Sequence, residues 1–263
     1  MAEVGRRCAL VTGGTAGIGA AFARRLAGTG HDLILVARDE ARLSSVAADL
    51  GGAYGVRVSV IPADLATDEG CERVEARLRD AGTPVDLLVN NAGISLNRSF
   101  VRSSIADEQR LLLLNVHAVM RLTHAALGPM TERGSGAIVN VSSASGFAPV
   151  MPGSTYPATK AWVTNFTQSV AMSVAGRGVR VMALCPGYTR TEFHDRASIA
   201  MASIPKFLWL DAEAVVTAAL ADLDRGKLVS IPDWRYKLAV LGMRNVPAGL
   251  IRRIAPDRRG RTD

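Results

Sequence analysis

The chain has 263 residues, 48% hydrophobic and 21% charged, a composition typical of a soluble globular protein and a length that fits one large domain. It has no signal-peptide core near its N-terminus and no apolar run approaching the ~18 residues of a membrane span, so we expect a cytoplasmic protein. The net charge is +7, but +6 of it lies after residue 226, where nine Lys and Arg face three Asp, so the composition does not support nucleic-acid binding by the whole chain.

Short apolar runs alternate with helical patterns from end to end. The runs indicate seven buried strands, at 7–12, 31–37, 56–61, 85–89, 137–141, 179–184 and 228–231. Helical segments are expected at 20–30, 40–50, 67–81, 104–132, 154–175 and 211–225, with Asp39, Thr67 and Ser104 as N-caps. This alternation predicts an α/β fold, a Rossmann-like doubly wound parallel sheet in a single domain, with ligands bound outside the carboxyl ends of the strands.

A glycine-rich turn follows the first predicted strand. Gly13, Gly17 and Gly19 permit a tight bend and a close backbone approach, and the N-terminus of the following helix favours an anion. The turn therefore predicts a phosphate-binding site, with a plain strand–helix connection as the alternative.

A phenol and an ammonium share one face of the helix predicted at 154–175. Tyr156 and Lys160 are four residues apart, which places their Cβ atoms roughly 5–6 Å apart. We expect the positive charge to lower the pKa of Tyr156 below its usual value of about 10, so that the phenol can act as a general acid or base. Ser143, at the end of a predicted strand, has a hydroxyl that could polarise a carbonyl oxygen. The alternative is that the pair only covers a helix surface.

Together these motifs resemble the single-domain branch of the short-chain dehydrogenase/reductase family over about residues 5–231. The matching residues are Thr12-Gly13-x-x-x-Gly17-Ile18-Gly19, Asp64, Asn90-Asn91-Ala92-Gly93, Asn115, Ser143, Tyr156-x-x-x-Lys160, and Pro186-Gly187 with Thr191. The resemblance implies a Rossmann-like fold and hydride transfer between a nicotinamide and an alcohol or carbonyl. It also implies a homodimer or homotetramer.

The resemblance implies a role for each matching residue. Tyr156 would be the acid/base, Lys160 would bind the nicotinamide ribose and lower the Tyr156 pKa, and Ser143 would hold the substrate oxygen. Asn115 would anchor a proton-relaying water, although a buried Asn satisfied by the backbone is the alternative. Asp64 would meet the adenine, Asn91 the adenosine side and Thr191 the carboxamide. The implied cofactor-binding residues are Gly13, Thr15, Gly17, Ile18, Gly19, Arg38, Asp64, Leu65, Asn91, Ala92, Gly93, Tyr156, Lys160, Pro186, Gly187, Thr189 and Thr191.

The end of the second strand decides which nicotinamide cofactor we expect. An NAD-preferring site carries an Asp or Glu there, about 20 residues after the glycine turn, to bond the ribose 2′-hydroxyl. This strand instead ends in Arg38, whose guanidinium can hold a 2′-phosphate through two charge-assisted hydrogen bonds. Asp39 is the counter-argument, and we interpret it as a helix N-cap. We therefore expect NADP(H) to be preferred over NAD(H). The three cysteines and the histidines lack metal-ligand spacing, so we expect no metal.

Two segments follow the shared motifs. Residues 192–210, within the predicted catalytic domain 1–231, form an apolar loop that suggests a lipophilic substrate, unless its side chains simply pack on the domain. Residues 232–263 form a basic C-terminal extension that Pro247 divides into two short helices. It could border the substrate entrance or contact an anionic membrane, with a solubilising tail as the alternative.

The sequence thus predicts an NADP(H)-dependent oxidoreductase interconverting a carbonyl and an alcohol on a lipophilic small molecule. One alternative is an NAD(H)-dependent secondary alcohol dehydrogenase. A non-catalytic dinucleotide-binding regulator would not need Asn115, Ser143, Tyr156 and Lys160 together. A protein whose tail binds a membrane or a partner would also account for the basic extension. A sugar-nucleotide epimerase fits less well, because its usual glycine spacing and its longer substrate domain are missing.

Overall fold

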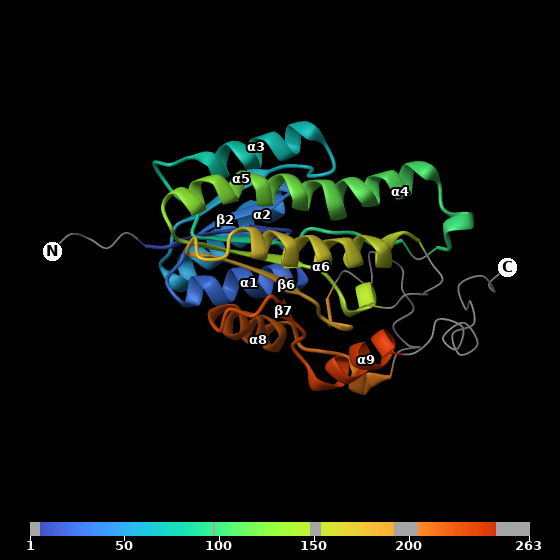
Figure 1. The fold of residues 1–263 in the computed structure, drawn as a ribbon. Coiled ribbons are helices and arrows are strands. Elements are labelled where there is room, and N and C mark those ends of the chain that lie inside the picture. The colour runs from blue at the N-terminus through green and yellow to red at the C-terminus, as the bar shows by residue number, and fades with distance from the viewer. Residues whose placement is uncertain (1–5, 97, 148–153, 192–204, 246–263) are drawn as a thin grey trace.

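The computed structural model describes residues 6–96, 98–147, 154–191 and 205–245. Seven strands form one sheet in the order β3-β2-β1-β4-β5-β6-β7, and every neighbouring pair is parallel (Figure 1). The strands are β1 (Cys8–Thr12), β2 (Asp32–Ala37), β3 (Val58–Pro62), β4 (Leu87–Asn90), β5 (Gly136–Val141), β6 (Val179–Leu184) and β7 (Val229–Ser230). The doubly wound sheet predicted from the sequence is confirmed, and each strand bound lies within two residues of the prediction.

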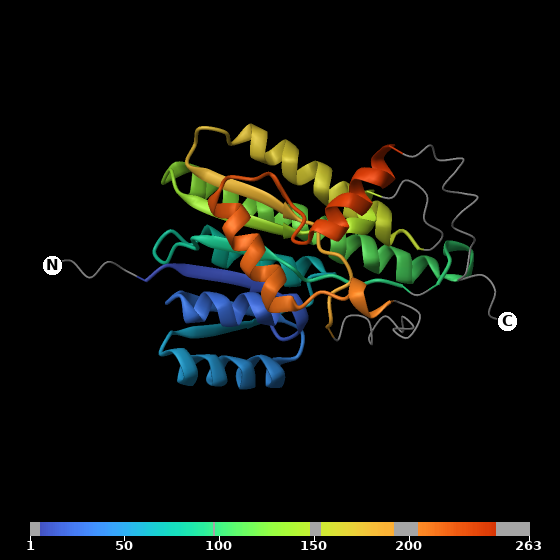
Figure 2. The same cartoon turned by 90° about the horizontal axis from the view of Figure 1, so that it is seen from below.

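Helices cover both faces of the sheet. The described helices are α1 (Gly17–Gly28), α2 (Glu40–Tyr54), α3 (Asp68–Arg79), η1 (Phe100–Arg102), α4 (Ile105–Leu112), η2 (Leu113–His117), α5 (Ala118–Glu132), η3 (Ala144–Phe147), α6 (Tyr156–Ser173), η5 (Lys206–Leu208), α8 (Ala212–Asp224) and α9 (Trp234–Asn245). α3, α5 and α6 pack on one face, and α1, α2 and α8 on the other, which Figure 2 views from below. The core therefore has two layers, because strands buried on both faces need an apolar cover on each.

The predicted N-caps are confirmed. Asp39 accepts a hydrogen bond from the backbone N–H of Arg42 at 2.9 Å, and Ser104 accepts one from Asp107 at 3.1 Å. Thr67 caps α3 in the same way. A side-chain oxygen at this position satisfies a backbone donor that has no partner inside the helix. The carboxylate of Asp39 is therefore directed into its own helix.

The predicted helix over residues 104–132 is interrupted in the structure. α4 and α5 are separated by the π-helical turn η2, which contains Asn115. A π turn holds one extra residue and is often found at functional sites. The whole segment, Ile105–Glu132, is long and apolar enough to cross a membrane by length and composition alone, although no single run in the sequence suggested this. It contacts α3 and strands β4 to β6, so packing within this fold accounts for part of its apolar residues, while Ile105, Leu112 and Met120 are exposed.

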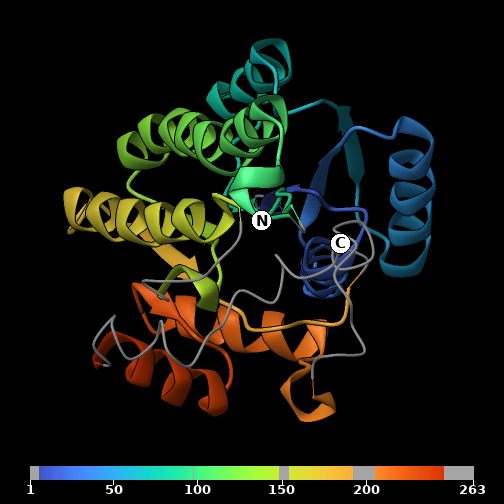
Figure 3. The same ribbon diagram turned by 90° about the vertical axis from the view of Figure 1, so that its right-hand side faces the viewer.

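The segments that follow the strands meet at one edge of the sheet. They are the glycine turn after β1, Arg38 after β2, Asn91 after β4, Ser143 after β5 and Pro186 after β6. Figure 3 looks onto this edge, with α1 and α2 on one side and α6, η3 and α9 on the other. Residues 192–204 of the predicted loop, and the second helix expected beyond Pro247, lie outside the described residues.

Candidate active site

A pocket of about 1020 Å³ opens at the carboxyl edge of the sheet. Ser143, Tyr156 and Lys160 line it, as do all the predicted cofactor-binding residues except Gly19. Asn115 is not among the lining residues. The cofactor-binding and catalytic residues expected from the sequence therefore make up 17 of the 36 residues that line the described pocket, just under half.

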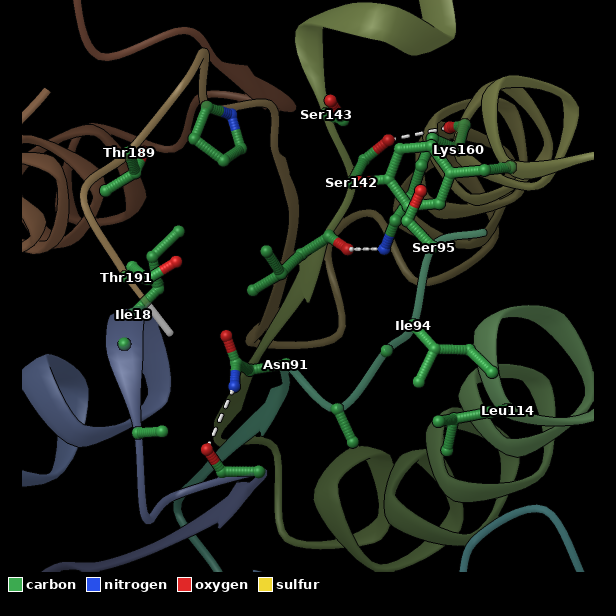
Figure 4. Close-up of a pocket in the computed structure, with 18 of the residues that line it drawn as sticks. Ile18, Asn91, Ile94, Ser95, Leu114, Ser142, Ser143, Lys160, Thr189 and Thr191 are labelled. Carbon is green, nitrogen blue, oxygen red and sulfur yellow. Dashed lines mark hydrogen bonds between the residues drawn. The ribbon is translucent and has the colours of Figure 1, made fainter. Parts of the chain in front are cut away.

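The glycine turn is held in place by the segment that follows β4, the strand beside β1. The side-chain amide of Asn91 donates to the carbonyl oxygens of Thr12 and Gly13, at 3.0 and 3.3 Å. Figure 4 draws one of these bonds as a dashed line. In return, the Thr12 hydroxyl accepts the backbone N–H groups of Asn91 and Ala92. A Cβ on Gly19 would lie 2.2 Å from the Gly13 oxygen, which explains why a buried glycine is needed behind the turn. Asn91 therefore acts as a brace of the turn in this structure.

Three arginines line the end of the pocket next to β2 and β3. They are Arg38, Arg42 and Arg110. Arg110, on α4, makes a 2.6 Å ion pair with Asp64, a contact the sequence did not indicate because the two are 46 residues apart. Burial alone would raise the pKa of Asp64, but the hydrogen bonds from Arg110 and the Ala66 N–H outweigh it and hold that pKa below its usual range. This end of the pocket thus combines two hydrogen-bonded carboxylates, those of Asp39 and Asp64, with several guanidinium groups.

The phenol and ammonium lie together, but their pKa values differ from the expectation. The Lys160 Nζ is 5.7 Å from the centre of the Tyr156 ring and donates to the Val141 carbonyl at 2.8 Å. Loss of hydration raises the pKa of Tyr156 to about 12, although its hydrogen bond with Ser143 opposes this. Burial also lowers the pKa of Lys160 to about 8. The predicted lowering of the Tyr156 pKa is wrong for this structure, because desolvation of the buried phenol dominates its pKa.

The two adjacent serines have different environments. Ser142 is buried, and its hydroxyl donates to the Lys160 carbonyl at 2.6 Å and pairs with Thr164 at 2.7 Å. Ser143 keeps its hydroxyl in the pocket, where it accepts from Ser145 and shares a hydrogen bond with Tyr156. Only Ser143 is therefore placed to meet a substrate oxygen beside the phenol.

Asn115 is fully buried in the π turn and bonds to backbone. Its amide oxygen accepts from the Ile94 N–H, and its amide nitrogen donates to the Ile94 carbonyl, both at 2.9 Å. A further bond of 3.3 Å reaches the hydroxyl of Thr159 on α6. This pattern is the alternative raised from the sequence, a buried Asn satisfied by backbone. The side chain fixes Ile94, which lines the pocket, and its role as a water anchor stays a prediction.

Three lining residues belong to the C-terminal helix. Tyr236, Ala239 and Met243 of α9 reach the pocket, although the sequence had no motif that could identify them individually. Their spacing of three and four residues marks one helix face. The apolar tail pattern is the only signal that pointed toward them.

Comparison with known proteins identifies relatives of this chain. A family model for short chain dehydrogenases matches residues 7–201. Galactitol 2-dehydrogenase (L-tagatose-forming) of Cereibacter sphaeroides is 38% identical over 208 residues, covering 78% of this chain and 79% of that protein.

Solved structures extend the similarity to nearly the whole chain. The short-chain dehydrogenase from Sphingobium yanoikuyae in complex with NADPH is 38% identical with a TM-score of 0.83, covering 96% of this chain and 97% of that one. The bulky-bulky ketone specific alcohol dehydrogenase from Comamonas testosteroni is 34% identical with a TM-score of 0.78, covering 92% and 95%. The chain therefore belongs to the short-chain dehydrogenase family, and is an NAD(P)-dependent oxidoreductase acting on carbonyl or alcohol substrates.

Proposed function

We propose that the protein is an NADP(H)-dependent oxidoreductase that interconverts a carbonyl and an alcohol on a lipophilic small molecule. The observation that carries this proposal is the pocket itself. Ser143, Tyr156 and Lys160 share its wall with the glycine turn, so a dinucleotide and a small substrate fit side by side. The turn suits a pyrophosphate, since Gly13 and Gly17 adopt φ values of 65° and 54° and leave backbone close to the ligand.

The bound cofactor and the side chains of this protein each carry out a part of the reaction. A bound nicotinamide supplies or accepts the hydride. Tyr156 gives its proton to the carbonyl oxygen during reduction, and Ser143 holds that oxygen through a hydrogen bond. Lys160, with a pKa of about 8, is mostly charged at neutral pH and stabilises the negative charge left on Tyr156. A phenol with a pKa near 12 therefore needs this cation to act as a base in the reverse direction.

The preference for NADP(H) rests on the end of β2. Arg38 and Asp39 both line the pocket, but the carboxylate of Asp39 accepts the backbone N–H of Arg42 as the cap of α2. Arg42 lines the same end, so a 2′-phosphate would meet positive charge there. The NADPH complex of the Sphingobium relative agrees with this choice. An NAD(H)-dependent secondary alcohol dehydrogenase is the alternative.

Apolar residues around the catalytic group favour a lipophilic substrate. Ile94, Ala144, Tyr188 and Met243 line this part of the pocket. The relative from Comamonas is specific for bulky-bulky ketones, which is consistent with an apolar site. The test is a panel of ketones, aldehydes and secondary alcohols, assayed with each cofactor by absorbance of the reduced nicotinamide. Turnover of hydrophobic ketones with NADPH is expected, and tight cofactor binding without turnover of any substrate would favour the regulator.

A second proposal concerns peripheral membrane contact by the C-terminal extension. Trp234, Leu238 and Leu241 form an outward stripe on α9, each at least 59% exposed, beside Lys237. We propose that this stripe and the basic tail touch an anionic membrane surface, because apolar and cationic residues together suit the lipid headgroup region.

A cytoplasmic location and a homodimer or homotetramer are further expectations. Size-exclusion chromatography with light scattering tests the oligomer.

Vesicle binding tests the membrane contact. The full chain is expected to co-sediment with anionic phosphatidylserine vesicles at low salt and to be released at high salt, because screening weakens surface electrostatics. Trp234→Ser should weaken binding, while Met172→Ser, which alters an exposed side chain on α6, should not. No binding of the wild-type protein at low salt would leave the extension as a solubilising tail.

A further inference from the structure

Helix α9 lies at the opposite end of the pocket from the arginines. It follows β7, the edge strand farthest from β3, and it packs against η3, the turn directly after Ser143. Figure 3 shows α9 on the same side as α6 and η3, with α2 across the molecule. The residues that α9 contributes therefore border the catalytic part of the pocket rather than the part assigned to the adenosine end of the cofactor.

Tyr236 fastens α9 to two separate segments. Its hydroxyl donates to the Leu208 carbonyl at 2.8 Å and accepts the Tyr188 N–H at 2.9 Å. Its ring lies against Gly187, where an added Cβ would come within 1.9 Å of a ring carbon. The tyrosine is only 8% exposed. One side chain thus joins the helix, the loop after β6 and the segment before α8.

A second set of contacts fixes the rotation of the helix. Arg235 pairs with Asp233 at 2.8 Å and bonds to the Phe207 carbonyl. Val240, one turn after Tyr236, is 4% exposed and joins the hydrophobic core. With these residues fixed, Ala239 and Met243 must face the pocket, and Leu238 and Leu241 must face away from it.

We propose that α9 is the outer wall of the substrate chamber, with Ala239 and Met243 as the residues that set the size of the substrate. Tyr236 is the positioning residue of this wall. The inference rests on the proposed function, since it concerns the same site. Ala239 contributes only a methyl group, so a larger side chain at this position would occupy volume that the substrate uses. Met243 is long and flexible, so its removal enlarges the chamber.

The test compares a series of methyl ketones with alkyl chains of increasing length. With NADPH as cofactor, kcat/KM is measured for the wild type, Ala239→Phe and Met243→Ala. Ala239→Phe is expected to lower kcat/KM for the longest ketone relative to the shortest by about tenfold or more, and Met243→Ala to change that ratio in the opposite direction. The Kd for NADPH should stay the same in both variants, because Ala239 and Met243 lie at the opposite end of the pocket from the arginines proposed to hold the 2′-phosphate.

Matched changes on the same helix serve as controls. Leu238→Phe and Leu241→Ala alter the outward face and should leave the size profile unchanged. Tyr236→Phe keeps the ring but removes both hydrogen bonds of the hydroxyl. It should reduce the discrimination between short and long ketones by a larger factor than it lowers kcat for the shortest one. An effect on overall stability alone would not produce this selective change.

The outcomes separate the inference from the proposed function. If the wild type turns over ketones and the pocket-facing variants keep its size profile, or if the outward variants shift it equally, the wall does not select substrates and the inference is wrong. If the wild type binds NADPH but reduces no carbonyl compound, the proposed function fails, and the inference fails with it.

Discussion

Tyr156→Phe is expected to remove nearly all turnover while preserving the fold and cofactor binding. The substitution deletes only the hydroxyl that shares a hydrogen bond with Ser143 and leaves the ring beside Lys160 in place. General acid–base catalysis typically increases the rate by a factor of about 10²–10⁴, so kcat should fall by a factor of about 10² or more. Steady-state kinetics with the best ketone of the panel measures the loss, and titration with NADPH measures cofactor binding.

A matched control separates this chemical loss from a structural one. Tyr54→Phe removes a phenol hydroxyl from α2, where the side chain is 43% exposed and does not line the pocket. It should leave kcat unchanged. Near-native activity of purified Tyr156→Phe would rule out the phenol as the acid/base, and an unfolded variant would show itself by loss of NADPH binding.

Arg38→Ala is expected to weaken NADPH binding and to leave NADH nearly unaffected. Hydrogen bonds to charged groups contribute roughly 1.5–3 kcal/mol, which corresponds to about a 10- to 150-fold change in Kd. NADH lacks the 2′-phosphate and therefore has no partner for this guanidinium. Fluorescence titration of the wild type and the variant with both reduced cofactors gives the four dissociation constants.

The Arg38→Ala variant supports the assignment only if its binding of NADPH weakens and its binding of NADH does not. Arg25→Ala removes an exposed guanidinium from α1 outside the pocket and should change neither constant. Equal weakening of NADPH and NADH in Arg38→Ala, or a wild type that binds NADH as tightly as NADPH, would contradict the assignment.

The sheet and its caps were predictable because their signals are local. Each strand is a short apolar run, and Asp39 and Ser104 precede helical patterns by one residue. The grouping of the catalytic residues was also predictable, since the carboxyl ends of parallel strands share one edge. These features depend on residues that are close in sequence or on a general rule of the fold.

The remaining features depend on contacts between distant segments. The π turn places Asn115 against Ile94, which lies 21 residues earlier and carries no motif. The pairing of Arg110 with Asp64 bridges 46 residues, and burial of Tyr156 reverses the pKa shift expected from Lys160 alone. The inner face of α9 is set by the packing of Tyr236 against Gly187, a residue in the distant loop after β6.

Isotope transfer tests the central claim, that this pocket moves a hydride onto a carbonyl carbon. The wild-type protein is incubated with a hydrophobic ketone and with NADPH deuterated at C4, using each of the two C4 epimers in turn, and the alcohol is analysed by mass spectrometry. One epimer is predicted to yield alcohol with a single deuterium on the carbinol carbon, and Tyr156→Phe to yield almost none. Alcohol without deuterium from both epimers, or no alcohol across the ketone panel, would contradict the account.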